Sequence, residues 1–387
     1  MSPQLWLGLL AFLDWPQFLG PTRNGVYPGT DVKWPTQIAW TREVGHGFAG
    51  PVIADGKVIL FHRKGLREIV EAFDAQTGKP IWDFQYPTTY EDEFGFDDGP
   101  RSAPTVVDGV VYTYGAQGML HAIDLATGKK LWHADLQEWY GAKKGFFGTG
   151  CSPLVANGRV HVIVGGKSFG IGSFDAKTGK LKWGATRHEA SYSSPVEAAF
   201  GLVFFTRRGL VVTDKETGKV TYEMPWRSRG ATSVNAASPV IDGNLLFVSA
   251  SYGVGAAVLD FSTNPPTRLW ANDDTLSAHY ATPVLKDGWL YGLHGMAQTG
   301  QELRAVEMKT GKVAWGMKTM GAGTVTLIGN DLLFLRDDGQ MFRVRPNPKE
   351  LEVLSNSKIA EGKVRAYPAV GNGLICMRDT KALTCVK

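Results

Sequence analysis

The sequence predicts an all-β fold: an eight-bladed β-propeller of four-stranded antiparallel blades, whose last blade is closed by an N-terminal strand. Two recurring patterns support this prediction. An Ala-x-Asp-x-x-Thr-Gly-Lys turn, or a close variant of it, recurs with an aromatic residue a few positions later. A unit starts at a proline position, which is followed by valine in four of the units, and continues with a tight turn that is usually Asp-Gly or Asn-Gly and a β-rich run. Repeats of roughly 40 to 50 residues built from short strands are typical of propeller blades.

Eight units follow one another along the chain, each marked by a proline position. These positions are 42 to 53 residues apart and are Pro51, Pro104, Pro153, Pro195, Pro239, Pro283, Val325 (where valine replaces the proline) and Pro368. The runs after them, such as residues 245–248, are short, β-branched or aromatic, and bounded by turn residues. This pattern argues against a helical solenoid, the main structural alternative.

The repeated residues have structural roles in this interpretation. The aspartate accepts backbone N–H bonds, and the glycine adopts the left-handed conformation that the turn requires. The tryptophan on the outer strand is large and flat enough to fill the seam between neighbouring blades. The residues to which we assign these roles are Asp74, Gly78, Trp82, Asp124, Gly128, Trp132, Asp175, Gly179, Trp183, Trp270, Gly311, Trp315 and Trp40.

The last unit has room for only three strands before the chain ends. Residues 36–40, in contrast, look like an extra outer strand, because they carry a tryptophan and no blade precedes them. We therefore predict that this N-terminal strand completes the eighth blade. Closing the ring in this way would remove exposed strand edges, which invite aggregation.

Residues 34–387 are predicted to form this single propeller, and residues 1–33 a separate N-terminal segment. Within that segment, residues 5–13 resemble the apolar core of a secretory signal, but no basic region precedes them and no clear small-residue cleavage site follows. Two interpretations of these residues stay open: a shortened signal peptide, with a latch in the rest of the segment, or a buried N-terminal segment. The apolar stretch is too short for a membrane span, and we expect a periplasmic or secreted protein.

The composition narrows the range of partners. The chain has 387 residues, 20% of them charged, and a small formal net charge of +4 that is scattered along the sequence. No polybasic run with interleaved aromatic residues is present, which argues against nucleic-acid binding. We expect a monomer that binds a protein, or else a small molecule or glycan, on its loop face.

The chain has three cysteines: Cys151, Cys376 and Cys385. No Cys-x-x-Cys-His motif is present, which excludes a covalently bound c-type haem. Cys376 and Cys385 lie on the two arms of a predicted hairpin, and they face each other directly if its tip is Thr380-Lys381. A disulfide is one interpretation if the protein is exported; two small buried hydrophobic residues are the other.

The predicted binding site is the mouth of the central channel, where the variable loops enter the inner strands. Small residues come just before each proline, and polar or aromatic side chains stand one or two positions further out. The candidates are His46, Arg101, Tyr192, Asn235, His279, Tyr280 and Arg365. An arginine fork suits a carboxylate, so Arg101 and Arg365 are the most suggestive. The alternative is the polar lining of a water-filled funnel.

The loop at residues 91–98 is acidic and contains two phenylalanines. Calcium needs six to eight oxygen ligands, and Asp97 and Asp98 could contribute some of them. No recognised calcium spacing is present, so we predict no metal site. A solvated acidic loop or a protein-docking tab are the other interpretations.

The turn-and-tryptophan phrase, repeated along a chain of eight units, resembles that of the PQQ-like (pyrroloquinoline quinone) repeat family. One branch of that family consists of quinoprotein alcohol dehydrogenases, which bind PQQ and a calcium ion over the central channel. A second branch, the outer-membrane-assembly lipoprotein B type, has no cofactor and binds partner proteins. Residues 15–21 and 99–104 are similar to a third group, secreted bacterial propellers of unassigned role.

The sequence departs from the dehydrogenase pattern. It has no adjacent Cys-Cys pair, no long insertions beyond the blades, and no convincing set of metal ligands with a base. We therefore expect a non-catalytic binding or assembly module with no assigned catalytic residue and no cofactor. The alternative that the resemblance implies is a PQQ-dependent oxidoreductase that acts on an alcohol or sugar, with PQQ and calcium at the funnel.

Overall fold

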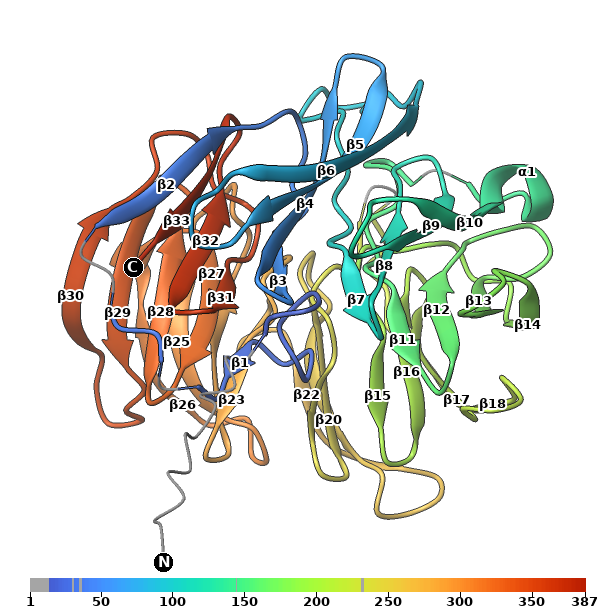
Figure 1. Ribbon diagram of the computed structural model, residues 1–387. Coiled ribbons are helices and arrows are strands. Elements are labelled where there is room, and N and C mark those ends of the chain that lie inside the picture. Colours follow the sequence, from blue (N-terminus) through green and yellow to red (C-terminus); the bar gives the residue numbers. More distant parts are fainter. Residues whose placement is uncertain (1–13, 30, 35–36, 144, 231–232) are drawn as a thin grey trace, which may run out of the picture.

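The computed structural model describes residues 14–29, 31–34, 37–143, 145–230 and 233–387. These residues form eight β-sheets that follow one another in sequence order around a central space (Figure 1). The prediction of an eight-bladed propeller is therefore confirmed. The apolar stretch at residues 5–13, on which the signal-peptide hypothesis depends, lies outside the described residues.

Seven of the eight blades begin with a three-residue strand near the central axis, and the seventh begins with a six-residue strand; the later strands of each blade lie progressively further out. The strands of the first four blades are β3 (Val52–Ala54), β4 (Lys57–Lys64), β5 (Arg67–Asp74) and β6 (Pro80–Pro87); β7 (Thr105–Val107), β8 (Val110–Tyr114), β9 (Met119–Asp124) and β10 (Lys130–Asp135); β11 (Leu154–Ala156), β12 (Arg159–Ile163), β13 (Ile171–Asp175) and β14 (Leu181–Ala185); and β15 (Val196–Ala198), β16 (Gly201–Thr206), β17 (Gly209–Thr213) and β18 (Val220–Pro225).

The second half of the ring repeats this order. Its strands are β19 (Val240–Asp242), β20 (Leu245–Ala250), β21 (Gly255–Asp260) and β22 (Thr267–Asn272); β23 (Val284–Lys286), β24 (Trp289–His294), β25 (Glu302–Glu307) and β26 (Val313–Met317); β27 (Gly323–Ile328), β28 (Asp331–Arg336), β29 (Gln340–Arg345) and β30 (Glu352–Lys358); and β31 (Ala369–Gly371), β32 (Leu374–Arg378) and β33 (Ala382–Val386). The helical elements are short: α1 (Leu136–Tyr140) and the 3₁₀ turn η1 (Lys318–Met320).

The N-terminal strand β2 (Ile38–Glu43) pairs antiparallel with β33 and completes the eighth blade. Figure 1 shows this blue strand beside the red C-terminal strands. The predicted closure is confirmed, although the strand extends further along the chain than residues 36–40.

In the same blade Cys376 lies directly opposite Cys385, and a disulfide joins the two.

The tryptophans of the repeat join each blade to the next. The Nε1 of Trp40 donates a hydrogen bond to the Ala75 carbonyl at 2.8 Å, and its ring covers Gly78. A Cβ on Gly78 would come within 2.5 Å of that ring, and its φ of +65° also favours glycine. Equivalent glycine contacts pair Trp82 with Gly128, Trp132 with Gly179, Trp183 with Gly218 and Trp270 with Gly311. Trp315 donates instead to the Asn347 carbonyl at 2.8 Å.

The turn aspartates also make the predicted bonds. The Oδ1 of Asp74 accepts from the backbone N–H of Thr77 at 2.8 Å, and Asp124 and Asp175 accept in the same way from the threonines of their own turns. The loops that enter the inner strands lie on one face of the ring, which we call the mouth face. These turns and the Asp-Gly turns lie on the other face, which we call the opposite face.

A chain of hydrogen bonds near the axis links five neighbouring blades. The backbone N–H of Ala103 donates to the hydroxyl of Ser152 at 2.9 Å, Ser152 to Ser194 at 2.9 Å, Ser194 to Ser238 at 3.0 Å, and Ser238 to Thr282 at 2.9 Å. Each of these hydroxyl residues directly precedes the proline that marks its unit. The small residues at the start of the inner strands therefore connect the blades as well as giving them room.

Residues 14–29 form an N-terminal plug inside the ring. Its strand β1 (Val26–Tyr27) pairs parallel with the inner strand β27, which gives the seventh blade five strands where we predicted four. Trp15 forms an antiparallel bridge with Ile53 of β3, and the Pro16 carbonyl accepts from Val106 of β7. Because the plug contacts the inner strands of several blades, it lies between them in the channel.

A buried arginine, Arg23, attaches the plug to the start of the third and fourth blades. Arg23 is 5% exposed and donates to the carbonyls of Pro195, Pro153 and Ser152 at 3.0, 2.9 and 3.0 Å, and to Gln17 Oε1 at 3.0 Å. Burial lowers its pKa to about 10, so the guanidinium stays charged at neutral pH.

Among the described residues, no helix has the length and apolar character needed to cross a membrane.

Candidate functional site

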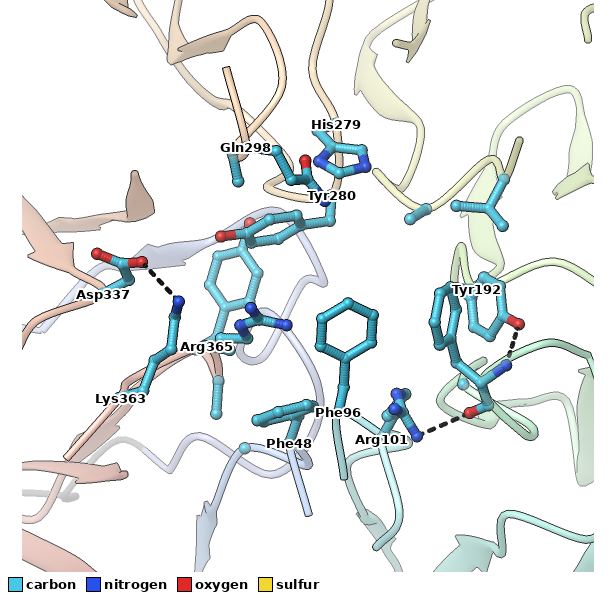
Figure 2. A pocket seen from close by; sticks show the side chains of 18 of the residues that line it. Phe48, Phe96, Arg101, Tyr192, His279, Tyr280, Gln298, Asp337, Lys363 and Arg365 are labelled. Carbon is cyan, nitrogen blue, oxygen red and sulfur yellow. Dashed lines mark hydrogen bonds and ion pairs between the residues drawn. The ribbon is translucent and has the colours of Figure 1, made fainter. Parts of the chain in front are cut away.

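A pocket opens on the mouth face, at the end of the channel that the N-terminal plug leaves free. Its volume is about 360 Å³, and Figure 2 shows its lining from close by. Aromatic side chains dominate the lining: Phe18, Phe48, Phe96, Phe147, Tyr192, Tyr252, Tyr280 and Tyr367. Phe18 comes from the plug and contacts Tyr367 edge to face at 5.4 Å between ring centroids. The plug therefore forms part of the pocket wall.

Five of the seven residues proposed from the sequence line this pocket. They are Arg101, Tyr192, His279, Tyr280 and Arg365. His46 and Asn235 do not line it. The side chain of His46 is 68% exposed and lies 3.5 Å from Asp97, between its Nδ1 and the Oδ2 of the carboxylate. Asn235 is buried, and its amide donates to the carbonyls of Thr206 and Trp226 at 2.8 and 2.9 Å.

The hydrogen-bond donors of Arg101 are directed at the protein itself. Its Nη2 donates to Asp92 Oδ2 at 2.6 Å, and its Nη1 donates to the Phe147 carbonyl at 2.8 Å. The Asp92 side chain has no exposed surface, so the two form a buried ion pair. Arg101 therefore holds two loops of the mouth face together.

The acidic loop at residues 91–98 is tied together by its own carboxylates. Asp92 Oδ1 accepts from the backbone N–H of Phe94 at 2.9 Å, and Asp97 Oδ1 accepts from Gly99 at 2.7 Å. Asp98 Oδ1 accepts from the N–H of Asp92 at 2.8 Å. These bonds shape the loop and present Phe94 and Phe96 to solvent, where they are 48% and 52% exposed.

Arg365 differs from Arg101 in its bonding. Its guanidinium carbon lies 5.3 Å from the ring centroid of Phe48 and 5.4 Å from that of Phe96. It makes no hydrogen bond or ion pair with any residue that the structure describes. In Figure 2 its N–H groups lie within the pocket, between Tyr280 and the two phenylalanines.

The remaining polar residues of the pocket form local pairs. Tyr252 Oη and His279 Nε2 are 2.8 Å apart, and burial together with the charge of Arg365 lowers the pKa of His279 to about 4. The imidazole is therefore neutral at pH 7 and poorly matched to general base catalysis at that pH. Lys363 Nζ and Asp337 Oδ2 form an ion pair at 3.6 Å on the rim.

The hydroxyl of Tyr192 accepts a hydrogen bond from the Phe147 backbone at 2.8 Å. Burial raises the pKa of Tyr192 to about 12, and burial is also the main cause of the raised pKa of Tyr280. Both phenols therefore stay protonated at neutral pH. They supply aromatic surface and hydroxyl groups to the pocket, and no negative charge.

Sequence reasoning missed most of the aromatic lining. Phe18, Phe48, Phe96 and Phe147 come from loops or from the N-terminal plug, where the repeat gives no positional guide. The available signal for Phe18 was its place in residues 15–21, a conspicuous aromatic and proline-rich run before the first blade. That signal indicated a segment of interest and did not indicate where it would lie.

The residues near the pocket do not fit a calcium site. Within the described part of the chain, no group of three or more His, Cys, Asp or Glu side chains is placed to hold a metal ion. Both carboxylate oxygens of Asp92 are engaged, and Asp97 and Asp98 each use Oδ1 in the loop bonds given above. Asp337, the carboxylate in the pocket lining, is paired with Lys363.

Comparisons with known proteins confirm the resemblance to the PQQ-like repeat proteins. The profile of the family described as outer membrane protein assembly factor BamB matches residues 66–317. BamB of Yersinia pestis is 22% identical over 286 residues, which cover 70% of this chain and 70% of that protein. A quinohemoprotein alcohol dehydrogenase of Comamonas testosteroni is 31% identical over 163 residues, which cover 39% of this chain. The matched stretch spans 21% of that enzyme's length.

Solved structures of the same two kinds of protein align with this chain. BamB from Moraxella catarrhalis aligns with a TM-score of 0.67 at 16% identity, covering 90% of this chain and 96% of that one. The quinohemoprotein alcohol dehydrogenase from Comamonas testosteroni aligns with a TM-score of 0.69 at 15% identity, covering 96% and 80%. At such low identity these likenesses show the fold alone, because one fold supports many functions.

Proposed function

This chain belongs to the family of the outer membrane protein assembly factor BamB, and from that premise we propose that it is a non-catalytic binding or assembly module that receives a protein partner at its mouth face. The observation that carries the proposal is the aromatic pocket with its exposed rim. Aromatic residues and arginine are enriched at protein interfaces, and exposed apolar patches mark interaction sites.

The rim extends the aromatic surface beyond the pocket. Phe94 lies 5.9 Å from Phe146 and 5.2 Å from Phe147 between ring centroids, and Phe96 lies 5.9 Å from Phe147. These rings come from two loops that Arg101 and Asp92 bind together. The patch is therefore pre-organised, which lowers the entropic cost of binding.

We place this module in the periplasm or outside the cell. The Cys376–Cys385 disulfide supports this location, since structural disulfides persist in oxidising compartments and are rare in the cytosol.

The similarity to quinohemoprotein alcohol dehydrogenases makes a PQQ-dependent oxidoreductase the second candidate. The pocket residues do not fit PQQ with calcium. Three carboxylates on PQQ need several positive partners, whereas Arg101 is paired with Asp92 and Lys363 with Asp337. We therefore rank this candidate below the binding module. Titration of the purified protein with PQQ and calcium should give no thermal shift and no dye reduction with an alcohol or sugar; micromolar stabilisation with dye reduction would reverse the ranking.

A site-specific cross-linking experiment tests the binding module. The photoreactive residue p-benzoylphenylalanine replaces Phe96 on the mouth face or, as a control, Leu131 on the outer edge of the second blade. The two positions are 52% and 53% exposed, so accessibility is matched. We expect a protein adduct of one defined mass from position 96 in living cells and none from position 131. Equal adducts from both positions, or none from position 96, would contradict the proposal.

A further inference from the structure

One guanidinium in the pocket lining, that of Arg365, donates no hydrogen bond to any of the described residues. Arg101 and Arg365 share an aromatic setting, because each lies over Phe48, at 5.5 and 5.3 Å, and over a second phenylalanine. Arg101 donates to Asp92 and to the Phe147 carbonyl. Arg365 has no such acceptor among the described residues. This difference indicates that the Arg365 guanidinium is available to donate hydrogen bonds to an acceptor on a bound ligand.

The charges of the pocket point to an anion with a single negative charge. Four charged side chains line it: Arg101, Asp337, Lys363 and Arg365. Asp337 is paired with Lys363, and Arg101 with the buried Asp92. Arg365 therefore carries the one positive charge in this lining that has no partner in the described structure. A planar guanidinium suits a carboxylate, which it binds with two parallel hydrogen bonds.

The surroundings of Arg365 specify the rest of the ligand. Phe18, Phe48 and Tyr280 line the same cavity of about 360 Å³, and Figure 2 shows Tyr280 and Phe48 on either side of the Arg365 guanidinium. A flat apolar group in this space would make the offset or edge-to-face contacts that aromatic rings prefer. The cavity has room for one such group with its acid, at the lower end of the range for ligand pockets.

We propose that this pocket binds an aromatic group that carries one carboxylate, with the carboxylate on Arg365 and the ring among the phenylalanines and tyrosines. The proposal deepens the proposed function and rests on it, because it names what the pocket recognises on a partner. Two sources share this chemistry: the C-terminal residue of a polypeptide that ends in an aromatic amino acid, and a free aromatic acid.

Calorimetric titration with three small probes tests the ligand class. N-acetyl-L-phenylalanine has both the ring and the acid, N-acetyl-L-phenylalaninamide lacks the charge, and N-acetyl-L-alanine lacks the ring. We expect loss of either feature to weaken binding about tenfold or more, since charge-assisted bonds and aromatic contacts each contribute at this level. Equal affinity for acid and amide, or no binding of N-acetyl-L-phenylalanine at millimolar concentration, would overturn the proposal.

Variants of Arg365 test the assigned residue. Arg365→Gln should weaken binding of N-acetyl-L-phenylalanine about tenfold or more and leave the amide unaffected, while Arg365→Lys should recover part of the loss. The control Arg187→Gln removes the same charge from an exposed mouth-face side chain outside the pocket lining and should change affinity less than twofold. Because Arg365 makes no hydrogen bond to the described residues, its variants should keep the parent's near-ultraviolet circular dichroism. Unchanged affinity in a folded Arg365→Gln variant would overturn the assignment.

Two further measurements separate the outcomes. A hexapeptide that ends in phenylalanine should bind more tightly than N-acetyl-L-phenylalanine if the source is a polypeptide terminus, and equally if it is a free acid; either result supports the shared chemistry. If none of the probes binds while the cross-link from position 96 persists, the ligand proposal fails and the proposed function stands. If both are absent, the proposed function fails as well.

Discussion

Two arginines of the mouth face differ in their bonding, because Arg101 donates to the buried Asp92 carboxylate and Arg365 donates to none of the described residues. Their positions just outside the small residues of the inner strands were sufficient to predict that both lie at the channel mouth, and both line the pocket. Their roles could not be predicted, because the partner of Arg101 is Asp92, which lies on a loop outside the repeat. The fold of that loop therefore decides that Arg101 is the arginine paired with a carboxylate, whereas Arg365 has no such partner among the described residues.

The buried pair predicts a stability effect. Replacing Arg101 with Met leaves the unexposed Asp92 carboxylate without its counter-ion. Breaking a buried ion pair in this way costs about 3 to 5 kcal/mol, so the midpoint of urea unfolding should fall clearly. The double variant Arg101→Met with Asp92→Leu should recover part of the loss, since it removes the unpaired charge. A single variant as stable as the parent would show that the pair contributes nothing to folding.

Buried histidines predict a pH effect. Burial is the main cause that lowers the pKa of His121 to about 3, and those of His161 and His279 to about 4, from the ordinary value of 6.5. Below pH 6.5 the unfolded chain binds protons that the folded chain does not, so each histidine reduces stability as the pH falls from 6.5 toward its folded pKa. The expected loss by pH 5 is on the order of 1 to 2 kcal/mol for each histidine.

The test compares the parent with His121→Phe, which keeps an aromatic ring among its neighbours Phe84 and Tyr86. Burial raises the pKa of Glu68, which acts in the opposite direction, so the readout is the difference between the two proteins. Urea unfolding at pH 7 and pH 5 should show a smaller loss for the variant. Identical losses would contradict the assigned role of His121.

At the scale of elements, the N-terminal plug is the largest departure from the sequence prediction. The strand β2 was predictable because it carries the repeat tryptophan, Trp40, and the last unit lacked a strand. The plug has no repeat to align it, and its contacts join residues far apart in the chain, such as Arg23 with Pro153 and Pro195. Only folding brings these partners together.

Arg23 should therefore matter for stability despite lying outside the repeats. Arg23→Met removes the donors to the carbonyls of Ser152, Pro153 and Pro195. The hydroxyl of Thr105 still donates to the Pro153 carbonyl at 2.7 Å, so the carbonyls of Ser152 and Pro195 are the two that lose their arginine donor. Because each buried acceptor left without a donor costs about 1 to 3 kcal/mol, we expect a total loss of roughly 2 kcal/mol or more in the unfolding free energy. Chemical denaturation provides the measurement, with the exposed Arg187→Met as a control that should match the parent. A variant indistinguishable from this control would refute the role of the plug.

The hairpin of β32 and β33 carries the second element-scale prediction. Its disulfide closes a short loop, since Cys376 and Cys385 are 9 residues apart. In the chain-entropy description such a loop contributes about 2 to 3 kcal/mol. The double variant Cys376→Ala with Cys385→Ala should lose about this much stability and should no longer respond to a reducing agent, whereas the parent should be destabilised by it. A parent that ignores the reducing agent would contradict this prediction.

At the scale of the whole molecule, the ring closes where β2, which follows the plug, pairs with the C-terminal strand β33 in one blade. Trp40 on β2 packs on Gly78 of the first blade, so the seam that closes the circle is built like the others. The repeat therefore predicted the architecture closely. It predicted the function poorly, because the repeated turns lie on the opposite face, and the pocket is built from loops and from the plug.

The proposed function requires that partners bind at the mouth face. Hydrogen–deuterium exchange of the purified protein, with and without the partner captured by the cross-link from position 96, tests it most directly. We predict that protection will concentrate in the loops at residues 91–98 and 145–150, which carry Phe96 and Phe147. Protection confined to the Thr-Gly-Lys turns of the opposite face, with these two loops unchanged, would contradict the claim.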